Sequence, residues 1–311
     1  MNIREEGGRV SIRSAASWGR ADSAMVVACF FWALGTVLTK GAAGGGDGQF
    51  KVFTYHGIRM ALATVCMFTG LRLSGRDCRI EPGDVGIFLL VSFTGFFAFM
   101  AVFHFGLSMT SAANAGILIG TIPLFIMLIS VLTGRERPGL YVVLGMLLGL
   151  AGVLSITGLS GVGEVSLGDG LVIISCVSWA FFTVFGADLV KKYAAFVSMA
   201  WIFLFSTLFT LPLFLYDVFR QDWSGIEPRY WLYAVIAAVG PLVLSNTLYY
   251  YALSVIGPSR VGVYTNLEPV FTLVLAWFVA GEKVTVYHVT GLMAIFAGIR
   301  LIKVPRNMNS I

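Results

Sequence analysis

Three titratable side chains interrupt long apolar stretches of this 311-residue sequence and are the first candidates for chemistry. Glu268 directly precedes Pro269 in one run, and His56 and Arg59 lie three residues apart in another. If these runs lie in lipid, each charge costs about 2.5–3.5 kcal/mol on insertion scales, so a functional role is the default hypothesis. The Glu268 carboxylate could attract a substrate ammonium group or take up a proton, and the two-pronged Arg59 guanidinium could bind a carboxylate.

A structural role is the alternative for each of these residues. Glu268 could bond to a neighbouring helix, and Arg59 could pair with Glu268 or lie against backbone carbonyls. His56 shares a helical face with Arg59 and could line a vestibule or simply be hydrogen-bonded.

Two further polar stripes arise at the helical spacing i, i+4. Asn246 pairs in this way with Tyr250, and Tyr264 pairs with Glu268. Such stripes are expected to face the interior of a helix bundle instead of lipid. We therefore add these residues to the candidate substrate-binding set.

The elements that must position these residues are membrane helices. Of the whole chain 58% is hydrophobic and 12% charged, against about 25% charged in typical soluble domains, so too few polar residues remain to cover a soluble surface. Continuously apolar runs of about 20 residues without dyad alternation predict an all-α, polytopic membrane protein, not a barrel. The ten predicted transmembrane helices cover residues 22–40, 50–73, 85–107, 111–133, 138–158, 169–190, 195–216, 230–254, 259–280 and 284–303.

The distribution of basic residues predicts the orientation in the membrane. With the N-terminus in the cytoplasm, fifteen of the 21 Lys and Arg residues fall in cytoplasmic segments and five in outer ones. This bias predicts that both termini are cytoplasmic in the cell inner (plasma) membrane. The tails would then be residues 1–21 and 304–311, with an outer linker at 159–168.

The strongest signal in the chain is an internal repeat. Six residues recur 147 positions later, from helix 1 to helix 6: Asp22, Cys29, Trp32, Ala33, Thr36 and Val37. Helices 4 and 5 recur at an offset of 146, where Gly116, Pro123, Phe125, Glu136, Gly145 and Gly152 match Gly262, Pro269, Phe271, Glu282, Gly291 and Gly298. Five helices is an odd number, so the repeats 22–158 and 169–303 are expected to have inverted topologies, as in many secondary transporters.

The repeat adds candidates of its own. Trp32 and its copy Trp179 could stack on a substrate or could pack at the pseudo-symmetric interface. His104 aligns with Tyr250, so both halves place a polar ring at one depth. Pro123 and Pro269 are candidate hinges, because proline leaves a backbone carbonyl without its helical donor.

Two features of the repeat concern packing. Phe182 stands where helix 1 has Gly35, and Glu268 stands where helix 4 has Ile122. Helix 5 carries Gly145, Gly149 and Gly152, a small-residue surface that suits close packing within the bundle or contact between two copies of the chain.

The chain resembles the EamA family of the drug/metabolite transporter superfamily over nearly all of residues 22–303. The residues that carry the resemblance are Trp32, Gly35, Lys40, Arg59, Pro123, Gly134–Glu136, Trp179, Leu267–Phe271, Gly281, Glu282, Gly291 and Gly298. The resemblance implies ten helices, cytoplasmic termini, a central cavity between the halves, and export or exchange of amino acids or related metabolites.

These patterns predict a secondary transporter of small metabolites that works by alternating access and acts as a monomer or weak dimer. No nucleotide-binding loop, catalytic motif, metal-ligand spacing or nucleic-acid-binding stripe occurs, so we expect no cofactor and no enzymatic activity. A membrane-embedded enzyme or a channel remains the alternative. One deep arginine disfavours phosphorylated substrates, whereas one acid, one base and many aromatics suit an apolar or aromatic amino acid, with the proton as the candidate coupling ion.

Overall fold

The computed structural model describes residues 7–43, 45–107, 109–110, 115, 118–157, 166–280 and 286–302, and within these ranges the chain is helical without strands. The helices of the first half are α1 (Gly7–Ala43), α2 (Val52–Leu73), η1 (Pro82–Asp84), α3 (Val85–Ser92), η2 (Phe93–Ala98), α4 (Phe99–Leu107), α6 (Ile122–Leu132) and α7 (Leu140–Thr157). Those of the second half are α8 (Leu167–Lys192), α9 (Ala195–Val218), α10 (Pro228–Ala237), η3 (Ala238–Leu244), α11 (Ser245–Ile256), α12 (Pro258–Thr265), α13 (Leu267–Ala280) and α14 (Val286–Ile302). The tail 304–311, most of the linker 159–168, and the repeat residue Glu282 lie outside the described ranges.

The apolar runs form the predicted helices. Five are long and apolar enough to cross a membrane: Gly19–Ala43, Pro82–Leu107, Leu167–Lys192, Ala195–Val218 and Pro228–Ile256. Three more apolar helices are shorter: Ile122–Leu132, Leu140–Ser155 and Val289–Ile302. Their outward faces carry large apolar side chains such as Leu132, which is 75% exposed, as lipid contact requires. An all-helical, polytopic membrane fold is thus confirmed, whereas the total of ten spans stays a prediction.

The helices differ from the predicted runs where the backbone bends. α1 begins at Gly7, well inside the predicted tail. The third and eighth predicted helices each contain a π-helical segment, η2 and η3. The ninth is broken at Asn266, between α12 and α13. π-Segments and breaks inside membrane helices are tolerated where the freed backbone groups face protein.

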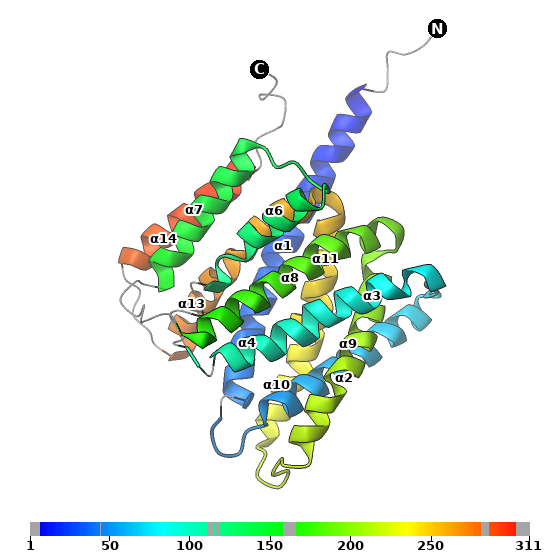
Figure 1. Cartoon of the computed structure of the whole chain (residues 1–311), viewed down its shortest axis with the longest axis vertical. Coiled ribbons are helices and arrows are strands. Elements are labelled where there is room, and N and C mark those ends of the chain that lie inside the picture. The colour runs from blue at the N-terminus through cyan, green and yellow to red at the C-terminus, as the bar shows by residue number, and fades with distance from the viewer. Residues whose placement is uncertain are drawn as a thin grey trace.

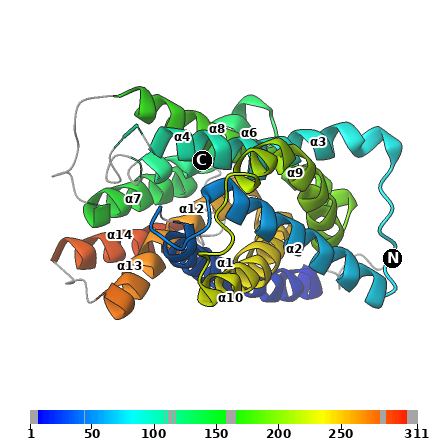
Figure 2. The same ribbon diagram turned by 90° about the horizontal axis from the view of Figure 1, so that it is seen from below.

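The two halves interlock instead of standing side by side. α1 packs against α11 and α13 of the other half, and α8 packs in the equivalent way against α4 and α6. Across the pseudo-symmetry axis, α2 packs on α9 and α7 on α14 (Figures 1 and 2). Both termini lie at one end of the bundle, which we call the terminal face, and the turns after α1 and α9 lie at the opposite, distal face (Figure 1).

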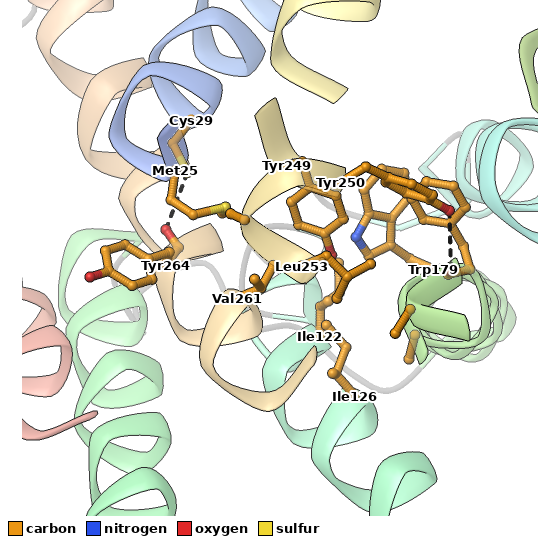
Figure 3. Close-up of a cluster of buried hydrophobic side chains, with 14 of the residues drawn as sticks. Met25, Cys29, Ile122, Ile126, Trp179, Tyr249, Tyr250, Leu253, Val261 and Tyr264 are labelled. Atoms are coloured by element: carbon orange, nitrogen blue, oxygen red, sulfur yellow. Dashed lines mark hydrogen bonds between the residues drawn. The ribbon is translucent and has the colours of Figure 1, made fainter. Parts of the chain in front are cut away.

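The repeat extends to individual hydrogen bonds. The Cys29 thiol of α1 donates to the carbonyl of Tyr264 at 3.2 Å, and its copy, the Cys176 thiol of α8, donates to the carbonyl of Leu118 at 3.4 Å. Figure 3 shows the first of these bonds within the main apolar core. Because Leu118 and Tyr264 are themselves repeat counterparts, both buried cysteines hold the fourth and ninth predicted helices in the same way.

One size difference between the halves is compensated across the interface. The Phe182 ring of α8 occupies the space where Gly95 of η2 would carry a Cβ. In the mirrored crossing, a Cβ on Gly35 of α1 would lie 2.6 Å from Cβ of Pro241 in η3. Each of these two helix crossings therefore contains one glycine and one bulky ring. Where α8 crosses η2 the ring is Phe182 of α8, and where α1 crosses η3 the ring is Pro241 of η3. This exchange explains why Phe182 replaces Gly35 in the repeat.

The glycines of helix 5 pack within the chain. A Cβ on Gly145 of α7 would lie 2.7 Å from the carbonyl oxygen of Gly298 in α14, and one on Gly152 would lie 2.6 Å from that of Gly291. Gly149 leaves room for the Asn266 side chain. The described structure thus uses this surface for close contact between α7 and α14.

Candidate functional site

Helix α1 brings the two deep charges of the sequence to neighbouring positions. Thr36 donates its hydroxyl to Oε1 of Glu268 at 3.4 Å, and Thr39 accepts a 2.5 Å hydrogen bond from Nη1 of Arg59. Thr36 and Thr39 are three residues apart, so both side chains lie on one face of α1. We call these four residues the α1 charge site; it joins the first half to α13 of the second.

Glu268 reaches this position because its helix is broken. α12 ends at Thr265, and α13 restarts at Leu267, so Glu268 lies in the first turn of a half-helix. The break precedes Pro269 by three residues, and α6 likewise begins one residue before Pro123. Half-helix ends inside the bilayer are typical of transporter binding sites, and both proposed hinge prolines lie in the first turn after such an end.

Arg59 does not form an ion pair with Glu268. The Arg59 side chain is buried, with its guanidinium carbon 5.1 Å from the centre of the Tyr55 ring. Within the described residues no carboxylate lies within ion-pair distance of it, and its Nε is buried without a hydrogen-bond partner. A buried guanidinium with an N–H group that has no acceptor can bind an anionic ligand group, because a buried donor without a partner raises the free energy of the folded protein.

The two histidines lie near this arginine. His56 lies three residues before Arg59 on α2 and shares its helical face. His56 is buried, and its Nε2 has no partner among the described residues. His104 is half-buried and makes an edge contact with Phe53 at 6.2 Å between ring centres. The structure therefore places His56, Arg59 and His104 in one distal region.

The repeated tryptophans meet each other. Trp32 and Trp179 form an edge-to-face pair with ring centres 5.9 Å apart. Tyr249 lies 5.1 Å from Trp32, and Phe182 lies 4.7 Å from Trp179. Much of both indole surfaces is thus used for packing at the pseudo-symmetry axis, although Trp32 stays half-buried and lies one turn from Thr36.

Three other predicted site residues lie away from the charges. Asn246 donates to the carbonyls of Pro241 and Leu242 at 3.1 and 2.9 Å, which satisfies backbone groups in the π-helical segment. Tyr264 donates to Oδ1 of Asp22 at 2.5 Å, nearer the terminal face. Tyr250 is fully buried against α8, with its hydroxyl 3.5 Å from the Phe182 carbonyl (Figure 3).

Sequence reasoning missed Thr39 and Tyr55 as partners of Arg59. A signal for Thr39 existed, because it lies three residues after the repeated Thr36 and so shares its face. The same signal existed for Tyr55, which lies four residues before Arg59 on α2 and therefore shares its helical face.

An ionic latch joins the halves at the terminal face. Lys192 lies 2.5 Å from Oε2 of Glu81 and 2.7 Å from Oδ2 of Asp84, and Tyr193 donates to Asp84 at 2.5 Å. These contacts lower the pKa of Asp84, chiefly through its hydrogen bond with Lys192, and raise the pKa of Lys192, chiefly through Asp84. Arg135 of the first half adds a pair with Asp188 of the second at 2.8 Å.

Comparisons with known proteins agree with this architecture. A family model described as the EamA-like transporter family matches residues 19–158 and 166–304, one copy for each half. The uncharacterized transporter YetK of Bacillus subtilis is 27% identical over 81% of this chain and 78% of its own. An uncharacterized transporter of Archaeoglobus fulgidus is 29% identical over 63% of this chain and 68% of its own. A protein crystal structure covering 93% of this chain and 99% of its own superposes with a TM-score of 0.74 at 18% identity, which indicates the same fold.

Proposed function

Because this chain belongs to the EamA-like transporter family, we propose that it is a secondary transporter of apolar or aromatic amino acids or closely related metabolites. We further propose ten transmembrane helices with both termini in the cytoplasm of a cell with an inner membrane, alternating access between the halves, and net export. The direction of export rests on the family resemblance alone. The proton is the coupling ion we propose, with Glu268 as its acceptor.

The observation that carries this proposal is the α1 charge site. An acid and a base from different halves are held on neighbouring threonines of one helix without pairing with each other. A structural pair would be expected to close, because the buried Arg59 charge is destabilising without a counter-ion. A gap between opposite charges is suited to a ligand that carries both.

The spacing suits an α-amino acid. Cβ atoms at i and i+3 of a helix lie about 5–6 Å apart, and each charged group is one hydrogen bond beyond its threonine. An α-amino acid, whose charged groups are about 3 Å apart, spans about 8–9 Å with one charged hydrogen bond of about 2.8 Å at each end. The ammonium group would bind Glu268 and the carboxylate would bind Arg59.

Aromatic rings beside the charges favour an apolar side chain on the substrate. Trp32 is half-buried and lies one helical turn before Thr36. Its ring contacts Trp179, with ring centres 5.9 Å apart, and Trp179 contacts the half-buried Phe99 of α4, with ring centres 5.0 Å apart. Rings left partly exposed inside a membrane protein offer stacking surface.

The proposal is tested by counterflow in liposomes preloaded with unlabelled ligand. The panel contains an aromatic amino acid, its decarboxylated amine and its deaminated acid. We expect the wild type to favour the zwitterion, Arg59→Gln to lose the preference over the amine, and Glu268→Gln to lose the preference over the acid.

Lys191→Gln is the matched control, because it removes one positive charge from an exposed position on the terminal face. It should behave as the wild type. Counterflow of no amino acid would refute the substrate class. Unchanged preferences in both site variants, with transport intact, would refute the roles of Arg59 and Glu268.

A further inference from the structure

The two halves differ in how closely α4 and its counterpart α11 each approach the first two helices of their own half. On the terminal side, α11 packs against α8 and α9. On the distal side, its counterpart α4 makes no comparable backbone approach to α1 or α2 within the described residues, although the Phe53 ring contacts rings of α4. Because the repeats are inverted, this asymmetry describes a molecule closed on the terminal side and more open on the distal side.

Two tyrosines make the closed contact. Tyr249 of α11 shares a 2.6 Å hydrogen bond with the Thr183 hydroxyl of α8, and both side chains are fully buried. Tyr250 lies over Gly186, where a Cβ would overlap its hydroxyl, and approaches the Phe182 carbonyl. Figure 3 shows both tyrosines between the core and the Trp179 helix.

The counterparts of these residues lie apart in this structure. By the repeat offsets, Phe103 and His104 of α4 correspond to Tyr249 and Tyr250, and Thr36 and Thr39 of α1 correspond to Thr183 and Gly186. Thr36 is exposed and His104 half-buried, whereas Thr183 and Tyr250 are completely buried.

We propose that His104 is the distal gate residue, and that in the alternate state α4 closes on α1 with His104 over Gly35 and Thr39, as Tyr250 now lies over Phe182 and Gly186. The sizes agree with this docking. The long tyrosine faces a residue without a side chain, whereas the shorter imidazole faces a threonine. This inference rests on the alternating access proposed above.

The gate and the α1 charge site would use the same threonines. In the present state Thr39 binds Arg59 and Thr36 binds Glu268. Closure of α4 would bring His104 to Thr39 and Phe103 to Thr36. Arg59 and Glu268 must then give up their hydrogen bonds to these two threonines. A bound zwitterion supplies replacement partners for both charges, which would make occupancy a condition for closing the gate.

A reversible crosslink tests the gate. The double variant Thr39→Cys/His104→Cys carries a protease site in the exposed turn at 74–76, so that a disulfide keeps the cleaved fragments together on a non-reducing gel. A disulfide needs Cα atoms within about 7 Å, an approach that closure of α4 on α1 would give residues 39 and 104. We expect crosslinking that increases with substrate. Because Thr39 belongs to the α1 charge site, counterflow by the reduced double variant should be weaker than that of the wild type; oxidation should abolish it, and reduction of the same sample should restore it to that weaker level.

Thr39→Cys/Phe105→Cys is the matched control, because Phe105 follows His104 but is 54% exposed. The wild type controls for the four native cysteines. Equal crosslinking at 104 and 105, or counterflow that proceeds while the 104 pair neither crosslinks nor responds to oxidation, would overturn the gate. Crosslinking in a protein that transports no amino acid would support the gate and refute only the proposed substrate.

Discussion

The contact between α7 and α14 gives a prediction whose size follows from the geometry. A Cβ on Gly298 would lie 2.5 Å from the carbonyl oxygen of Gly145, about 0.9 Å short of ordinary contact at 3.4 Å. The obstacle is backbone, so Gly298→Ala can be accommodated only if the helices separate. Overpacking of this kind costs about 1–3 kcal/mol, while alanine gains about 0.5–1 kcal/mol over glycine inside a helix.

Gly170→Ala in α8 is the matched control, because a Cβ there meets nothing within 4 Å. It gains the same helix propensity without the clash, so the difference between the two variants isolates the clash at about 1–3 kcal/mol. At about 2 °C per kcal/mol for a chain of this size, Gly298→Ala should unfold about 2–6 °C below Gly170→Ala in a thermal scan of detergent-purified protein.

The double variant Gly145→Ala/Gly298→Ala sharpens the test. Both changes act at one crossing, so the second should cost less than the first once the helices have separated. Equal unfolding temperatures for Gly298→Ala and Gly170→Ala would show that α7 and α14 are not in close backbone contact.

Three further outcomes are expected. Phe182→Ala should lower the free energy of unfolding by about 3–5 kcal/mol, because it empties the space beside Gly95, whereas Phe105→Ala at an exposed position should cost much less; similar thermal shifts for both would contradict the interlocked crossing. Thr39→Val should raise the KM for amino-acid counterflow about tenfold, since it removes a charged hydrogen bond from Arg59 worth about 1.5 kcal/mol, and an unchanged KM would remove Thr39 from the site. The stability that the latch contributes should not change with pH between about 5 and 9. The stabilisation from Asp84 is present above its ordinary pKa of about 3.9 and is lost as pH falls through its lowered pKa. The stabilisation from Lys192 is present below its ordinary pKa of about 10.4 and is lost as pH rises through its raised pKa. The difference in unfolding temperature between wild type and Lys192→Gln should therefore stay constant across that range, and a change near neutrality would contradict the assignment.

Much of the fold was predictable because lipid imposes a simple rule on composition. Apolar runs of membrane length had to be helices, and the recurrence of Pro123 as Pro269 and of Gly145 as Gly291 indicated two equivalent halves. The glycine pattern also indicated close helix contact, although only the structure identifies α14 as its partner.

The site was less predictable because rotation of each helix about its axis decides which polar groups meet. The sequence left open whether Arg59 pairs with Glu268, and the structure instead gives each its own threonine. The stripe of Asn246 and Tyr250 was expected to face the interior, and both residues do, but Asn246 serves the π-helical backbone. π-Segments follow from the local competition between helix geometry and packing, which periodicity alone does not report.

The two helix crossings between the halves, Gly35 on Pro241 and Phe182 on Gly95, place the small and the bulky residue on opposite helices. Each half therefore depends on the other for complementary packing. Two copies of the first half would set Gly35 against Gly95 and leave a void, and two copies of the second would force Phe182 onto Pro241. Expressed as separate polypeptides, the halves should therefore assemble only with each other. A duplicated ancestor that once paired with itself would lose that ability as soon as these substitutions accumulated, and each half would then require the other.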